Sequence, residues 1–204
     1  MKSDIVQDGD PVLRTVAPAV PEDMFGTKEL GELVERMLGA LDAERDGVAL
    51  AAPQIGVSLR IFVVRYDRLH EHPAGVVPEP EVGVYINPEF VKASRRRIEM
   101  DEGCLSVRRV YGKTVRYERA TVQARLPDGN VFTRGGGGIL AQIFQHETDH
   151  LDGVLFTDHA HDMVEIREED WEDYKQGRME RNMRDNAGGD VNMANDASTS
   201  PDTD

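Results

Sequence analysis

Two histidines four residues apart, His146 and His150, are the side chains of this sequence best suited to metal chemistry. They belong to QHETDHLDG, residues 145–153, which contains the pattern His-Glu-x-x-His. On a helix, residues at this spacing lie about 5–6 Å apart at Cβ, so both imidazoles can bind one ion. Glu147 would lie beside the ion and could take a proton from water, as in hydrolase metal sites. Two hydrogen-bonded core histidines would give the same spacing, so that alternative stays open.

A catalytic metal site also needs a third protein ligand and an open position for water. One protease pattern has a third histidine where this sequence has Phe156, and another uses a downstream glutamate, for which Glu168, Glu169 and Glu172 are available. Cys104, in the stretch EGCLS, is the other candidate, because a Cys-His-His set with water is a known catalytic arrangement. A lone cysteine is also a common buried apolar residue. Both ligand sets therefore remain open on these residues alone.

The helices that would position these residues can be predicted from apolar spacing. Over about residues 139–151, Ile139 and Ile143 precede the two histidines on one helix face, which directs the imidazoles inward. A second amphipathic helix is expected over residues 28–44. The stretch 165–184 is rich in charges and predicts a helix with a charged outer face. The chain should therefore contain an N-terminal, a central and a C-terminal helix.

Strands and connections are predicted from alternation and from turn residues. Strands are expected over residues 59–66, 84–86 and 114–126, with the return strand of a hairpin from residue 131. Residues 1–26 should form an extended arm, residues 70–83 a surface loop, and the glycines at 135–138 a flexible entry to the central helix. These glycines are not a phosphate-binding loop, because the Lys and Ser/Thr of that motif are absent.

Length and composition indicate one soluble domain with a real core. The chain has 204 residues, of which 39% are hydrophobic and 30% charged, and its net charge is −14. This charge argues against DNA as a partner, because broad phosphate binding needs clustered Lys and Arg. The run at residues 95–97 is three arginines, which we interpret as a solvated strand edge or turn, with a small RNA patch as the alternative.

The sequence also bears on the compartment. No stretch reaches the roughly 20 apolar residues of a membrane span. The start, MKSDIVQDGDP, is acidic and lacks an apolar segment, which argues against a secretory or transit signal. The single cysteine allows no internal disulfide. We therefore expect a cytoplasmic protein without a membrane contact.

Three segments in this order resemble one family: GVALAAPQIG at residues 47–56, EGCLS at 102–106 and QHETDHLDG at 145–153. Over residues 1–165 the chain resembles the peptide deformylases. The resemblance implies an α+β fold in which antiparallel strands pack around a central metal-binding helix. With the composition, it predicts a catalytic domain over residues 1–165, a C-terminal helix over 166–185 and a disordered acidic tail over 186–204.

The resemblance further implies an activity, removal of the N-formyl group from the formyl-methionine of newly made polypeptides. A metal-bound hydroxide would attack the formyl carbon. The ligands would be Cys104, His146 and His150, with Glu147 as general acid and base. The ion would be Fe²⁺ in the cell, with Zn²⁺, Ni²⁺ or Co²⁺ as alternatives. The formyl oxygen would be bound by Gln54 and the backbone N–H of Leu105.

The peptide substrate is expected to add a strand to exposed backbone of the enzyme. By resemblance, this edge and the methionine pocket would involve Val48, Ala49, Leu50, Gly103, Ile139 and Ile143. The sequence departs from the family pattern at Ala49, where glycine is usual, and at Arg108-Arg109, where a proline is usual. These departures bear on substrate preference and leave the ligands and the base intact.

Three alternatives follow from the same residues. The first is a metal-dependent formyl-peptide hydrolase, and the second is an endopeptidase whose third ligand is a downstream glutamate. The third is a binding protein that has kept the fold, with a contact to the ribosome left open. His159 and His161 could form a second metal site, but we interpret them as exposed loop residues.

Overall fold

In the computed structural model of the chain, the histidine-bearing segment forms the helix α2, Ile139–Leu151, as predicted. The structure describes residues 5–44, 46–69, 81–171 and 174. The chain divides into two compact units, Met1–Ile166 and Arg167–Asp204. The first unit contains α2, a second helix and eight strands among its described residues. In the part that is described, no helix is long and apolar enough to cross a membrane.

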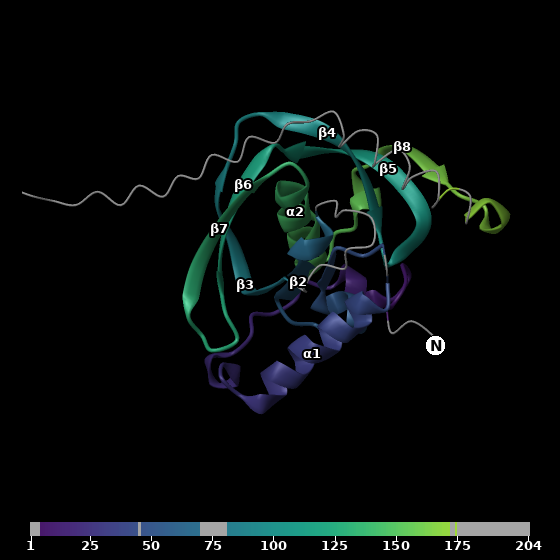
Figure 1. Cartoon of the computed structure of the whole chain (residues 1–204). Helices are drawn as coiled ribbons and strands as arrows, with labels where there is room; N and C mark the ends of the chain where they lie inside the picture. Colours follow the sequence, from purple (N-terminus) through teal and green to yellow (C-terminus); the bar gives the residue numbers. More distant parts are fainter. Residues whose placement is uncertain (1–4, 45, 70–80, 172–173, 175–204) are drawn as a thin grey trace, which may run out of the picture. The chain divides into compact units, whose positions relative to one another are not determined.

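Two antiparallel sheets surround α2. The larger one has the order β1-β2-β3-β6-β7 and the smaller one the order β4-β5-β8. Figure 1 shows α2 between the strands of the two sheets, and α2 contacts β1, β6 and β7 of the first and β5 of the second. The strands are β1 (Ala49–Ala51), β2 (Ile61–Arg65), β3 (Val82–Ala93), β4 (Arg97–Cys104), β5 (Val107–Tyr117), β6 (Arg119–Arg125), β7 (Val131–Gly137) and β8 (His161–Glu165).

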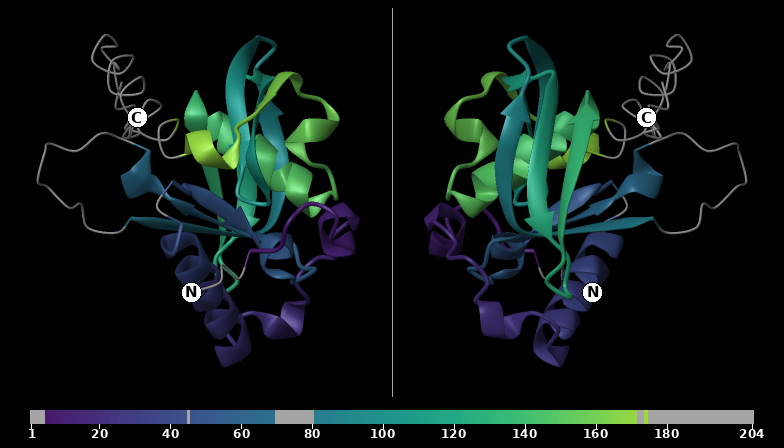
Figure 2. Two further views of the ribbon diagram at one scale, coloured as in Figure 1. Left: turned by 90° about the vertical axis from the view of Figure 1, so that its right-hand side faces the viewer. Right: turned by 90° about the vertical axis from the view of Figure 1, so that its left-hand side faces the viewer.

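The second helix, α1 (Lys28–Asp42), begins where Thr27 caps it by accepting a hydrogen bond from the Leu30 amide at 3.3 Å. At its other end the Arg68 guanidinium donates to the carbonyl groups of Leu41, Glu44 and Gly47, at 3.2, 3.3 and 2.7 Å. A cation at this position satisfies carbonyls that have no partner within the helix. In both views of Figure 2, α1 lies at the bottom, away from α2.

The apolar core consists of two clusters, one for each helix. The first joins the buried face of α1 to Leu50, Ile61, Val63 and Ile86 of the larger sheet. The second joins Ala141, Phe144 and Leu151 of α2 to Phe62, Val64, Tyr85 and Val122. The first four residues of β2 therefore alternate between the clusters, and the fifth, Arg65, is buried where it pairs with Asp67. The larger sheet is thus packed on both faces where the site is built.

The structure corrects several strand predictions. Residues 114–126, predicted as one strand, belong to β5 and β6 in different sheets, because the Glu118 backbone leaves the ladder to bond Arg96 and Gly138. The strand predicted to close at Asn87 continues to Ala93, since a register shift with a φ of 50° at Asn87 accommodates the proline that follows. The short strand β1 and the strands β4 and β8 were not predicted as such.

The glycine run was also interpreted wrongly. Gly135, Gly136 and Gly137 are the end of β7 and pair with β6, and only Gly138 leads into α2, with a φ of 55°. A Cβ at Gly136 would lie 2.7 Å from the Leu140 side chain, so the first turn of α2 packs directly on this strand. The glycines therefore permit a close strand–helix contact.

The second unit is described only at residues 167–171 and 174. Glu168–Asp170 is a short 3-10 helix, Trp171 and Tyr174 are helical, and their rings stack with centroids 6.1 Å apart. The rest of the predicted helix over 166–185 and the acidic tail over 186–204 lie outside the described residues. Most of the predicted loop at 70–83 does too, although residues 82 and 83 belong to β3.

Candidate metal centre

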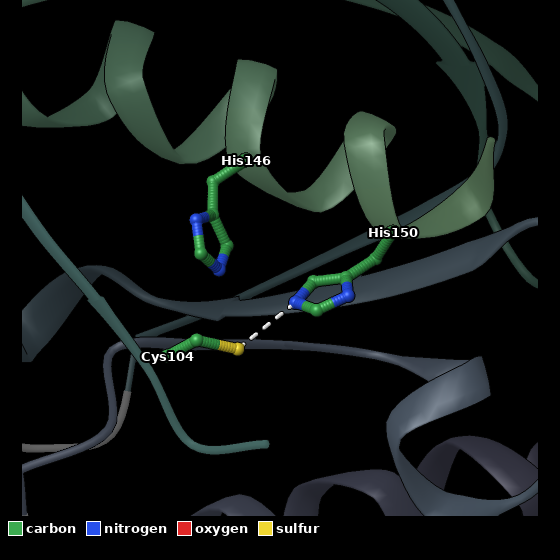
Figure 3. Close-up of side chains that lie close together, drawn as sticks. All are labelled: Cys104, His146 and His150. Atoms are coloured by element: carbon green, nitrogen blue, oxygen red, sulfur yellow. Dashed lines mark hydrogen bonds between the residues drawn. The ribbon is translucent and has the colours of Figure 1, made fainter. Parts of the chain in front are cut away.

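Three metal-ligating side chains meet between α2 and the end of β4. The Sγ of Cys104 and one ring nitrogen each of His146 and His150 all lie within 4.8 Å of one another. Figure 3 shows both imidazoles extending from α2 toward the thiol, and His150 Nε2 lies 3.2 Å from Cys104 Sγ. Cys104 and His146 are partly exposed, whereas His150 is buried. The cluster is therefore accessible to solvent on the side of Cys104 and His146.

Local backbone geometry brings Cys104 to the helix. β4 and β5 pair residue by residue up to Gly103 and Tyr111, and the register then shifts so that Cys104 lies opposite Val107. A Cβ at Gly103 would lie 2.5 Å from the Tyr111 ring, so only glycine allows this packing. In the tight turn that follows, the Ser106 amide donates to Cys104 Sγ at 3.4 Å. This hydrogen bond fixes the position of the Cys104 side chain relative to the turn.

The donor set fits a divalent ion. Cys104 Sγ and His150 Nε2 are 3.2 Å apart, and all three donor atoms lie within 4.8 Å of one another, so one ion between them could be reached by each. Burial lowers the pKa of His150 and so favours the neutral, metal-binding imidazole. Burial also opposes protonation of His146, but Cys104 and Glu102 outweigh it and raise the pKa of that imidazole. One thiolate, two imidazoles and an open side match a catalytic rather than a closed structural site.

Glu102 is a functional residue that the sequence reasoning missed. Its carboxylate, only 3% exposed, accepts from His146 Nδ1 at 2.6 Å, which leaves Nε2 of that ring free for a metal. Thr114, Arg116 and Gln142 donate to the same carboxylate at 2.5–3.2 Å. Burial alone would raise the pKa of Glu102, but the hydrogen bonds from His146 and Arg116 lower it well below its usual value. Its position two residues before Cys104 was the available signal.

Glu147, the residue after His146 on α2, is buried and has one carboxylate oxygen without a hydrogen-bond partner among the described residues. The residue is 3% exposed, and the oxygen is Oε2. Burial raises the pKa of this carboxyl to about 7. A buried carboxyl without a partner is costly and marks a group that acts on something bound beside it.

The structure also brings Gln54 to the cluster. The Gln54 Oε1 accepts from the Ala51 amide at 2.8 Å, and its Nε2 lies 3.2 Å from Ser106 Oγ and 3.5 Å from Cys104 Sγ. Because the Ala51 amide fixes the oxygen, the NH₂ group is directed to the thiol side. Leu105 follows Cys104 in the turn and packs against the core cluster of α1. Both predicted donors therefore lie next to Cys104.

The residues predicted to bind substrate differ in how deeply they are buried. Ile143 is buried in the core cluster of α2 and Val48 packs against it, so core packing accounts for both. Ala49 and Leu50 are also buried. Ile139 is 47% exposed, which contradicts its predicted inward position on the helix face. The helix begins at this residue.

The remaining candidates are accounted for by other contacts. Phe156 is buried, with its ring centroid 6.4 Å from that of His146. His159 and His161 are exposed, as predicted, and contact Asp149 and Glu99, but His161 begins strand β8 and is not a loop residue. Among the described residues, neither belongs to a group that could hold a second metal.

The structure places the two arginines that follow EGCLS, Arg108 and Arg109, on β5. Arg108 pairs with Glu44 at 2.7 Å, and Arg109 has a φ of 64°. The Arg95–Arg97 run lies at the turn into β4, as interpreted. Glu168 and Glu169 belong to the second unit.

Comparisons with known proteins identify the family of this chain. The family model for polypeptide deformylase matches residues 2–165. The chain is 40% identical over 166 residues to a peptide deformylase of Thermomicrobium roseum, covering 80% of this chain and 88% of that one. It is 43% identical over 152 residues to one of Acidobacterium capsulatum, covering 74% and 82%.

Solved structures give the same result. The structure is similar to peptide deformylase from Thermotoga maritima, with a TM-score of 0.65, 33% identity and coverage of 77% of this chain and 96% of that one. It is also similar to a class I type b peptide deformylase from Acinetobacter baumannii with Met-Ala-Ser bound, with a TM-score of 0.66, 31% identity and coverage of 76% and 97%. The chain therefore belongs to the polypeptide deformylase family, whose members are metal-dependent hydrolases that remove the N-formyl group from newly made polypeptides.

Proposed function

We propose that Cys104, His146 and His150 hold one divalent metal ion and that the chain uses this centre to release formate from formyl-methionyl polypeptides. The observation that carries the proposal is the convergence of a thiol and two imidazoles within 4.8 Å, beside a buried carboxyl without a partner. Such an ion acts as a Lewis acid, which polarises the formyl group and lowers the pKa of water. Fe²⁺ is proposed for the cell, with Zn²⁺, Ni²⁺ and Co²⁺ as alternatives that suit the same donors.

Glu147 is proposed to move the proton. With a pKa raised to about 7, it can accept a proton from water and return it near neutral pH. Water attacks the formyl carbon, a C–O bond forms, and Glu147 takes the proton. The C–N bond then breaks, and Glu147 delivers this proton to the departing amine. The second proton of the water stays on the formyl group, so the immediate products are formic acid and the free N-terminal amine, and the acid ionises to formate.

Gln54 and Leu105 are proposed to stabilise the charge that develops on the formyl oxygen. The Gln54 NH₂ group is held on the thiol side by Ala51 and Ser106, and the Leu105 N–H belongs to the residue after Cys104. Donors fixed before the reaction need no reorganisation when charge develops, and removal of one such donor costs about 10²–10³ in rate. These two groups come from different segments and meet only in the folded chain.

The peptide is proposed to lie along the free edge of β1, which pairs with β2 on its other side. Val48, Ala49 and Leu50 would supply backbone for the added strand on this side, and Gly103 of β4 would flank the peptide on the other side. Ile143, Val48 and Ile139 are less well supported as a methionine pocket, for the reasons given above. The Met-Ala-Ser peptide bound to the Acinetobacter relative is consistent with a peptide substrate. We place the reaction in the cytoplasm, and contact with the ribosome is a separate proposal that co-sedimentation would test.

One experiment tests the activity directly. The full chain is purified without oxygen, its metal content is measured, and formate release from a formyl-Met peptide is followed on the same sample. We expect about one metal ion per chain and turnover that a chelator removes. A metal-loaded chain that releases no formate would contradict the proposal.

A further inference from the structure

The N-terminal arm contacts both segments that carry the proposed formyl-oxygen donors. The Val6 amide donates to the Gln54 carbonyl at 2.9 Å, and the Asp8 amide donates to the Ser106 carbonyl at 2.8 Å. Between them, Gln7 Nε2 donates to the Leu105 carbonyl at 3.1 Å. Three consecutive residues of the arm therefore join two segments that are about fifty residues apart in sequence, near 54 and 105.

The arm is itself held in a defined conformation. Ile5 is 5% exposed and lies in the core cluster of α1, against which Leu105 also packs. Beyond it, the Asp10 amide donates to the Gln7 carbonyl at 3.1 Å, and Gly9 has a φ of 104°. Residues 7–10 thus form a four-residue hydrogen-bonded turn whose third residue, Gly9, is left-handed. This is the signature of a type II turn, and Asp8 occupies its second position. The arm is thus anchored on both sides of its contacts.

The contacts reach the metal ligand as well. The peptide group between Leu105 and Ser106 accepts from Gln7 through its carbonyl and donates to Cys104 Sγ at 3.4 Å through its amide. The Ser106 hydroxyl accepts from Gln54 Nε2 at 3.2 Å. A shift of the turn at 104–106 would therefore move the Leu105 donor and loosen the hydrogen bond that orients Gln54.

We propose that Val6, Gln7 and Asp8 are positioning residues that set the separation of the Gln54 and Leu105 donors. This inference rests on the proposed function, because it assumes that these groups bind the formyl oxygen. None of the three arm residues needs to touch substrate. Because the donors act on charge that exists mainly in the transition state, a misplaced pair should lower kcat while the binding of substrate changes little.

The type II turn allows one backbone hydrogen bond to be removed selectively. Proline is favoured at the second position of such a turn, so Asp8→Pro removes the N–H that bonds Ser106 while keeping the turn. Asp8→Ala is the matched control, because it loses the same side-chain contacts to Gly9 and Arg14 and keeps the N–H. Gln7→Leu is a second variant, which removes the amide that bonds Leu105.

The experiment measures kcat, KM, bound metal and affinity for the unformylated peptide, which lacks the formyl oxygen. We expect kcat of Asp8→Pro to be about tenfold below that of Asp8→Ala, since small misplacements of catalytic groups have effects of up to ~10²-fold. KM, bound metal and the affinity for the unformylated peptide should stay within about twofold. Gln7→Leu should lower kcat about two- to threefold, because its hydrogen bond is exposed.

Equal kcat values for Asp8→Pro and Asp8→Ala would overturn the inference. A Pro variant that loses metal or unformylated peptide as strongly as it loses kcat would also overturn it, because the arm would then support the whole site. These outcomes are distinct from failure of the proposed function, in which the metal-loaded wild type would itself release no formate.

Discussion

The two faces of α2 pack against different kinds of surface. On one face Phe144 lies in an apolar cluster, with ring centroids 6.4 Å from Phe62 and 5.4 Å from Tyr85. On the other face His146 meets the buried charges of Glu102 and Arg116. Apolar packing has little directional preference, whereas hydrogen bonds to charged groups are short and directional. The apolar face of α2 therefore stabilises the packing of the helix, and the polar face orients the side chains that it carries.

The polar face extends along the helix. Arg116 bonds Glu102 through Nε and one terminal nitrogen, and its other terminal nitrogen donates to Asp149 at 2.6 Å. Gln142, one turn before His146, also donates to Glu102. The β4–β5 hairpin thus holds α2 on both sides of His146. Removing one partner of such a buried network lowers the stability of the fold, because it leaves a buried charge without an opposite charge beside it.

The largest effect is expected at Glu147, whose buried Oε2 has no hydrogen-bond partner among the described residues. Replacing Glu147 with Gln should lower kcat by about 10²–10⁴, because proton transfer is lost while size and shape are kept. Metal binding should remain at one ion per chain, since Glu147 is not a proposed ligand. Formate release and metal analysis on the same sample provide the measurement. Loss of the metal in this variant would show that its role is wrongly assigned.

The apolar face is tested by Phe144→Ala. Truncating this fully buried ring should lower the free energy of unfolding by about 3–5 kcal/mol, measured with urea at 25 °C. The matched control is Ile139→Ala on the same helix, whose exposed side chain should contribute little. The folded fraction of Phe144→Ala should bind metal as the wild type does. A large loss of metal affinity in that folded fraction would contradict the division between the faces.

The polar face is tested by Glu102→Gln. Replacing the carboxylate that accepts from His146 should weaken metal binding by about 10–100-fold, measured by competition with a chelator. Glu99→Gln is the control, because Glu99 lies on the same strand but is exposed and pairs with Lys113. If Glu102→Gln and Glu99→Gln both bind metal as tightly as the wild type does, Glu102 does not orient the metal ligand His146.

The stabilising effect of Glu102 should depend on pH. Its pKa is lowered on folding, so its contribution is present above the unfolded value of about 4.3 and is lost as the pH falls. In metal-free protein, the difference in unfolding free energy between wild type and Glu102→Gln should therefore be larger at pH 7 than at pH 4. If the difference in unfolding free energy between the two proteins were larger at pH 4 than at pH 7, folding would raise the pKa of Glu102 instead of lowering it.

Sequence reasoning predicted the parts of the fold that have a clear period or motif. The helix over residues 139–151 was predicted with its bounds, and the one over 28–44 ends two residues earlier. The strand boundary at Glu118 was missed, because the alternation of apolar residues continues through it while the chain changes sheets. Glu102 escaped notice because a charged residue in a strand normally faces water, and its partners Arg116 and Gln142 come from distant segments. Local patterns do not encode such pairings.

The central claim is that one ion is shared by Cys104, His146 and His150. X-ray absorption of the Zn²⁺-loaded protein tests it most directly. The account predicts one sulfur at about 2.3 Å and nitrogen or oxygen neighbours at about 2.0–2.1 Å, with the sulfur absent in Cys104→Ala. A wild-type spectrum without sulfur in the coordination shell would contradict it.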